Sequence, residues 1–129
     1  MNKIVVEVSV GELLDKISIL EIKKEKIKDP EKLRFINNEH EVLKDQFLKN
    51  VKSDEKVDSL FKFLKEINNK LWVIEDDKRL CEKNSDFGDE FIKLSRDVHF
   101  LNDERAKLKL KINELTGSVI KEIKQYQTY

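Results

Sequence analysis

The sequence predicts a mainly α-helical fold, in which two antiparallel helical hairpins form a four-helix bundle and the N- and C-terminal segments form a small two-stranded sheet. Of the 129 residues, 40% are charged and 39% apolar, with only three glycines and one proline. This composition is typical of long helices with charged outer faces. Apolar residues recur in alternating steps of three and four, a heptad pattern, and two turn signals divide the chain. The length suits one domain, residues 1–129.

The N-terminal part combines a strand pattern with a helix start. Residues Lys3–Val8 are short and rich in β-branched side chains, which predicts a strand. Ser9 and Glu12 fit a capping box, where the hydroxyl accepts from a helical N–H and the glutamate reaches back. The first helix is therefore expected over Val10–Lys28.

Turn residues place the next two helices. Asp29 followed by Pro30 is a helix-start signal, so the second helix is expected over Pro30–Val51. Ser53 is expected to cap a third helix that ends at Lys83. The run Asn84–Gly88 has the composition of a turn.

The fourth helix and the end of the chain complete the pattern. This helix is expected over Asp89–Thr116, with Gly117 as its C-cap. The segment Ser118–Tyr126 could be a second strand. Both termini then lie at the same end of the bundle, which predicts that this segment pairs with the N-terminal strand.

The apolar positions also predict how the helices face each other. Antiparallel pairing around each turn brings apolar positions together, which supports both hairpins. The expected pairs include Ile27 with Leu33, Leu20 with His40, Cys81 with Phe91, Ile74 with Val98, and Ile67 with Arg105.

The second hairpin is longer than the first, and its part Trp72–Phe100 is expected to project beyond the Pro30 turn. An apolar surface of that size predicts a homodimer with antiparallel tips. Alternatively, the first two helices tilt along the long hairpin and cover it themselves.

Arg105 interrupts the apolar pattern of the fourth helix and needs an anion or access to water, because a guanidinium keeps its charge. The expected register puts Glu21 and His40 in its layer, with Glu21 as its anion. One interpretation is an anion site or an acid–base pair between helices. The other, which we favour, is a structural ion pair with a histidine filling its layer.

Further polar residues lie nearer the tip. Glu75 and Arg79 are four residues apart and can pair on one helical face. We expect no metal centre, although Glu75, Asp76 and Asp103 could together offer oxygen ligands to magnesium. Trp72 could stack on a base or sugar, or act as a contact between subunits.

Three more side chains flank Arg105 on the same helix. Asn102, Lys109 and Asn113 could join Arg105 in holding a phosphate or a carboxylate. The sequence therefore leaves an anionic small molecule open as a ligand.

Composition excludes several classes of function. The net charge is zero, which argues against duplex nucleic acid as a partner. No run of about 18 apolar residues predicts a membrane span, and no signal-peptide pattern is found, so we expect a cytoplasmic protein. Cys81 is the only cysteine, which rules out a disulfide within the chain, and its apolar position favours a buried thiol.

Four segments of the chain resemble a family of small bacterial proteins of unknown function. They are EVSVGELLDKISILEIK (Glu7–Lys23), LWVIEDDKR (Leu71–Arg79), DFGDEFIKLSRDV (Asp86–Val98) and NDERAKLKLKIN (Asn102–Asn113). The resemblance implies a common fold, but it brings no activity with it.

These observations lead to two functional hypotheses. The first is a non-catalytic interaction or assembly protein that dimerises through its long second hairpin. The second is a binding protein or enzyme for an anionic metabolite, such as a nucleotide or sugar phosphate, held by charged residues between helices. No motif in the sequence identifies an enzyme class.

Overall fold

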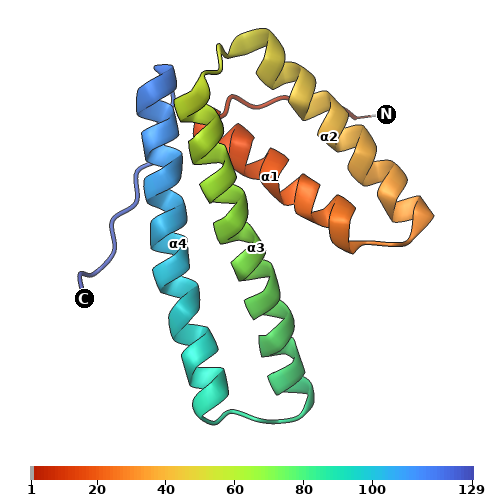
Figure 1. Cartoon of the computed structure of the whole chain (residues 1–129), viewed down its shortest axis with the longest axis vertical. Helices are drawn as coiled ribbons and strands as arrows, with labels where there is room; N and C mark the ends of the chain where they lie inside the picture. The colour runs from red at the N-terminus through yellow and green to blue at the C-terminus, as the bar shows by residue number, and fades with distance from the viewer. Residues whose placement is uncertain (1) are drawn as a thin grey trace.

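The computed structural model describes residues 2–129 and contains four helices, α1 (Val10–Lys26), α2 (Pro30–Asn50), α3 (Glu55–Lys83) and α4 (Asp89–Thr116). Figure 1 shows α1 and α2 as one hairpin, and α3 and α4 as a second, longer hairpin. The predicted helical class and the two hairpins are therefore confirmed.

Most of the predicted helix ends have the expected chemistry. The Ser9 hydroxyl accepts from the Glu12 amide at 3.0 Å, and Asp29 accepts from the Glu31 amide at 3.0 Å. Gly117 ends α4 in the left-handed conformation, with φ 63°, where a glycine costs least. Two expectations were wrong. Asp54 rather than Ser53 caps α3, and the Glu12 carboxylate accepts from Lys109 instead of reaching back.

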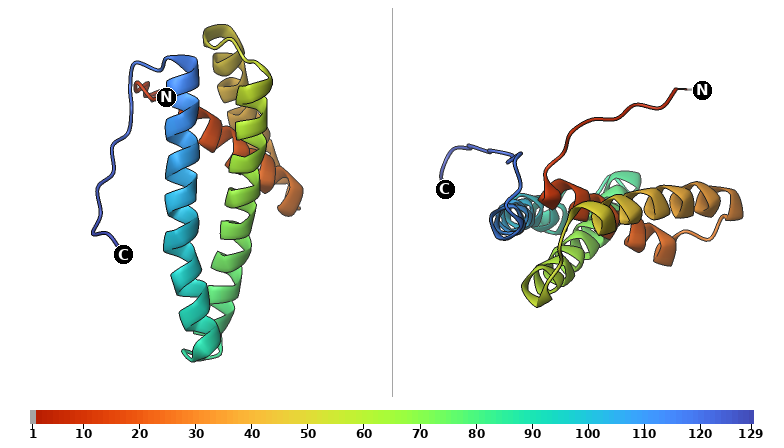
Figure 2. Two further views of the ribbon diagram at one scale, coloured as in Figure 1. Left: turned by 60° about the vertical axis from the view of Figure 1, so that its left-hand side comes forward. Right: turned by 90° about the horizontal axis from the view of Figure 1, so that it is seen from above.

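The predicted two-stranded sheet is wrong, because residues 2–129 contain no strand. The two terminal segments start from the same end of the molecule but lead in different directions (Figures 1 and 2). Gly117 turns the C-terminal segment back along α4, where the Tyr129 hydroxyl donates to Asp103. Residues 2–8 lead away from this segment and are exposed. Strand propensity alone does not form a sheet without an adjacent partner.

Helix α1 joins the two hairpins, because it packs against each of the other three helices. It crosses α3 and α4 obliquely, and α2 packs along its outer side, away from α4 (Figures 1 and 2). The main apolar core lies around this crossing and includes Leu14, Ile17, Phe47, Leu64 and Ile112. The expectation of a simple bundle is therefore met only in part.

The crossing is tight at the first turn of α1. A Cβ atom on Gly11 would lie 2.5 Å from the backbone oxygen of Lys109 in α4. The Gly11 amide donates to the Asn113 side chain at 2.7 Å. Only a glycine allows the two backbones to come this close.

The end of the second hairpin projects beyond α1 and α2, as predicted (Figure 1). Its interior holds a second, small apolar cluster with Ile74, Cys81 and Leu94 buried. Phe91 and Val98 pack against this cluster, in agreement with the predicted pairs. In the described chain, no helix has the length and apolar character to cross a membrane.

We expect Gly11→Ala to lower the free energy of unfolding by about 2 kcal/mol or more, because its methyl group would force α1 away from α4. Urea unfolding would measure this loss. Gly88→Ala is the control, since the nearest atom to its Cβ would be 3.4 Å away, and replacing this glycine N-cap by alanine costs about 1 kcal/mol or less. Equal losses for both variants would contradict the tight crossing.

Candidate functional site

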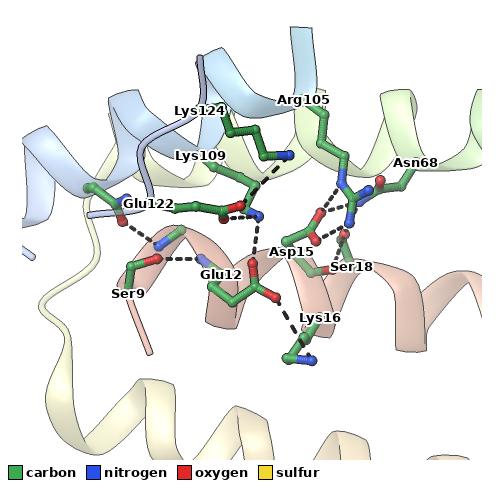
Figure 3. Close-up of polar contacts among 12 residues, drawn as sticks. Ser9, Glu12, Asp15, Lys16, Ser18, Asn68, Arg105, Lys109, Glu122 and Lys124 are labelled. Atoms are coloured by element: carbon green, nitrogen blue, oxygen red, sulfur yellow. Dashed lines mark hydrogen bonds and ion pairs between the residues drawn. The ribbon is translucent and has the colours of Figure 1, made fainter. Parts of the chain in front are cut away.

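The polar residues gather where α1 crosses the second hairpin (Figure 3), and Asp15 lies at their centre with 1% of its surface exposed. The Arg105 guanidinium binds Asp15 with two nitrogens, with Nε donating to Oδ1 at 2.8 Å and Nη2 donating to Oδ2. This two-point geometry fixes both the position and the orientation of the pair.

Two further side chains complete the surroundings of Asp15. Asn68 of α3 donates from Nδ2 to Asp15 Oδ1 at 2.8 Å and to the Ser18 hydroxyl at 2.8 Å. The Ser18 hydroxyl donates in turn to the Asp15 carbonyl at 2.7 Å. One carboxylate on α1 thus binds both helices of the second hairpin.

Lys109 forms the second half of the site, one turn along α4 from Arg105. Its ammonium donates to Glu12 of α1 at 2.5 Å and to Glu122 of the C-terminal segment at 3.0 Å. Lys124 approaches the other oxygen of Glu122 at 3.8 Å. Lys109 therefore links α4, α1 and the C-terminal segment.

Burial and hydrogen bonds act on these charges in opposite directions. Burial raises the pKa of Asp15, but the hydrogen bonds from Arg105 and Asn68 outweigh it, so the pKa lies below its ordinary value. Burial lowers the pKa of Lys109, but its bonds to Glu12 and Glu122 outweigh it and the pKa is raised. Both groups are therefore charged at neutral pH.

The arrangement favours a structural role over acid–base chemistry. Both oxygens of Asp15 already accept hydrogen bonds, and a lowered pKa makes a carboxylate a weaker base. Among the described residues that are not exposed, no buried side-chain nitrogen or oxygen lacks a hydrogen-bond partner. No polar group in this core therefore points to a missing ligand.

The predicted pairing of Arg105 with Glu21 is wrong, because Asp15 is the anion that Arg105 binds. Glu21 accepts instead from His40 Nε2 at 3.3 Å and from Lys65 at 3.4 Å. Lys24 approaches His40 Nδ1 at 3.3 Å. Since an ammonium only donates, this pattern fits a histidine with its proton on Nε2.

Glu21 cannot be the anion of Arg105, because Glu21 and Asp15 lie on different faces of α1. Six residues along an α-helix correspond to a rotation of about 240° between Asp15 and Glu21. They therefore belong to different faces of α1. The Glu21 face meets α2 through His40 and α3 through Lys65, whereas the Asp15 face meets α3 through Asn68 and α4 through Arg105.

The residues predicted nearer the tip do not join this site. Glu75 and Arg79 form the expected pair at 2.5 Å, but both are exposed. Trp72 is half-buried, and so is Asn102, which was predicted beside Arg105. No group of three or more His, Cys, Asp or Glu side chains in residues 2–129 is placed to hold a metal ion, so Glu75, Asp76 and Asp103 do not form one.

Sequence reasoning found Arg105 and Lys109 but missed most of their partners. Arg105 binds Asp15, and Lys109 binds Glu12 and Glu122. The other residues of the site that this reasoning missed are Gly11, Ser18 and Asn68. A usable signal was present, because Gly11, Asp15 and Ser18 follow each other at helical spacing and so share one face of the helix. The structure buries all three of them.

We expect Arg105→Met to cost about 3 kcal/mol of stability, because it leaves the Asp15 carboxylate buried without its counter-charge. Asp15→Leu should cost a similar amount for the converse reason. The double variant should lose clearly less than the sum of the two, since neither charge remains. Urea unfolding of the wild type, the two single variants and the double variant gives the double-mutant cycle that measures the coupling of the two side chains.

The control is the pair of Arg79 with Glu75, which has the same chemistry but is exposed. Arg79→Met should change stability far less than Arg105→Met. Strictly additive losses at Asp15 and Arg105 would show that the two side chains do not act as a pair.

Comparison with curated proteins and with solved structures gives no match. Comparison with protein families gives a match over residues 4–129, to a family of unknown function (DUF6165). The match spans all four helices and both halves of the polar site. The chain therefore belongs to the DUF6165 family, whose function is unknown.

Proposed function

We propose that this is a non-catalytic helical interaction protein that forms a homodimer through the projecting end of the α3–α4 hairpin. The observation that carries the proposal is apolar exposure on this end, where Leu80, Phe87 and Ile92 are each more than half exposed. We retain the cytoplasm as the expected location. The internal charges favour this function over catalysis, because they are already bound to each other.

The energetics of the projecting end favour a second copy. Only three apolar side chains in this part of the hairpin are buried, namely Ile74, Cys81 and Leu94. Two helices gain most of their stability from the packing of an apolar face. A two-fold dimer would use the same surface on both copies, and would cover Leu80 and Ile92 against the partner's hairpin.

A charge introduced into this surface tests the dimer. We expect the double variant Leu80→Glu/Ile92→Glu to be a folded monomer under conditions where the wild type is a dimer, because a buried glutamate has no counter-charge there. Light scattering after size-exclusion chromatography would measure both masses.

The matched control is Phe35→Glu/Val42→Glu, which makes the same charge change at two exposed apolar residues of α2. This variant should remain dimeric. A wild type that stays monomeric at all concentrations, or a dimer that both double variants leave intact, would rule out the hairpin interface.

A second candidate function, the binding of an anionic small molecule, is supported by one groove. It lies between α4 and the C-terminal segment, has a volume of about 190 Å³, and is lined by Lys107, Lys109, Lys124 and Glu122 among others. Three cations and one carboxylate attract a further anion. The groove is smaller than the pockets of about 300 Å³ and above that hold whole metabolites, so a phosphate group fits it better.

We expect pyrophosphate to raise the melting temperature, and Glu122→Gln to increase its affinity, because this carboxylate competes for Lys109. Lys107→Gln/Lys124→Gln should weaken binding, whereas Lys49→Gln, on an exposed pair with Asp45, should not. Thermal-shift titration against sodium chloride of equal ionic strength separates binding from salt screening. Equal shifts of the melting temperature with pyrophosphate and with sodium chloride would rule out anion binding in this groove.

A further inference from the structure

The N-terminal segment, residues 2–8, carries an apolar run that no helix covers. Ile4, Val5 and Val6 are 86%, 82% and 69% exposed, and the segment leads away from the helices (Figures 1 and 2). Consecutive β-branched side chains favour extended backbone that pairs with another strand. An exposed run of this kind is a template for pairing with a second chain.

We propose that residues Lys3–Glu7 pair in antiparallel fashion with the same residues of a second copy, around a two-fold axis at Val5. This register places Lys3 opposite Glu7 of the second copy, and Glu7 opposite Lys3, so that both charges are matched. Ile4 then lies opposite Val6, and Val5 opposite Val5. Opposite charges in directly facing positions stabilise a strand pair.

The side-chain alternation selects the same register. In extended backbone Ile4, Val6 and Val8 share one face, and the other face carries Lys3, Val5 and Glu7. Pairing around Val5 keeps the apolar faces of both copies on one side of the ribbon. A slip of one residue would mix the two faces, and a slip of two would put Val5 opposite a charged residue.

The structure also explains why the partner is a second copy and not the C-terminal segment of the same chain. Two hydrogen bonds hold that segment along α4, one from Lys109 to Glu122 and one from the Tyr129 hydroxyl to Asp103. The N-terminal segment is held only at its base, where Ser9 is buried as the cap of α1. Seven extended residues span about 23 Å, enough to reach a second molecule.

Two short strands are only marginally stable in water, so the ribbon also needs cover for its apolar face. Exposure along that face falls toward α1, from 86% at Ile4 to 69% at Val6 and 40% at Val8. The helices thus partly cover the apolar face at Val8, next to Ser9. This contact is separate from the hairpin interface proposed above and does not depend on it.

Charge reversal tests the register directly. Lys3→Glu makes both facing pairs acidic, and Glu7→Lys makes both basic, so each single variant should self-associate about tenfold more weakly than its parent. The double variant Lys3→Glu/Glu7→Lys should regain the parent affinity. A mixture of the two single variants should also regain it, because every facing pair again joins opposite charges.

The parent for these measurements is the full chain carrying Leu80→Glu/Ile92→Glu, a double change that removes the proposed hairpin contact. Sedimentation equilibrium at high protein concentration gives the dissociation constants. Val5→Pro should abolish association, because proline supplies no ladder donor. Lys121→Glu, an equal charge change in the exposed C-terminal segment, should have no effect. A parent that does not self-associate, or a mixture no tighter than its components, overturns the proposal.

Discussion

The ion pair of Asp15 with Arg105 is the interaction on which the arrangement of the two hairpins depends. A carboxylate with 1% exposure is tolerated only beside a fixed counter-charge. Arg105 meets it with two donors, which favours one orientation of α4 against α1. Asn68 adds α3 to the same carboxylate. This orientation requires a glycine at position 11, because it brings the backbone of Gly11 against the backbone of Lys109.

The oblique crossing of α1 leaves part of the second hairpin's apolar surface uncovered. Because α1 lies obliquely, it covers the base of the second hairpin and leaves the tip with a small cluster of its own, around Ile74 and Leu94. Helix α2 follows α1 away from α4, so it cannot cover the tip either. Apolar surface therefore remains on the tip. Residues 2–8 are exposed for a separate reason, because the C-terminal segment that could pair with them is held along α4.

Much of the fold could be predicted, because helix ends and hairpin registers are set by local chemistry. Asp29 at a helix start and Gly117 at a helix end have their expected roles. The angle between the hairpins could not be predicted, since it depends on the Gly11 crossing and on Asp15, far from Arg105 in sequence. Heptad reasoning followed apolar positions and therefore chose Glu21, on the α2 side, as the anion. The N-terminal segment has strand propensity, but propensity does not specify a partner.

The charges that hold α1 are insensitive to pH in the physiological range. The pKa of Asp15 is lowered from 3.8, so its stabilisation is present above that value and is lost only as the pH falls through the lowered pKa. The pKa of Lys109 is raised from 10.5, so its stabilisation is present below that value and is lost only as the pH rises through the raised pKa. Between these limits the crossing of α1 is fixed.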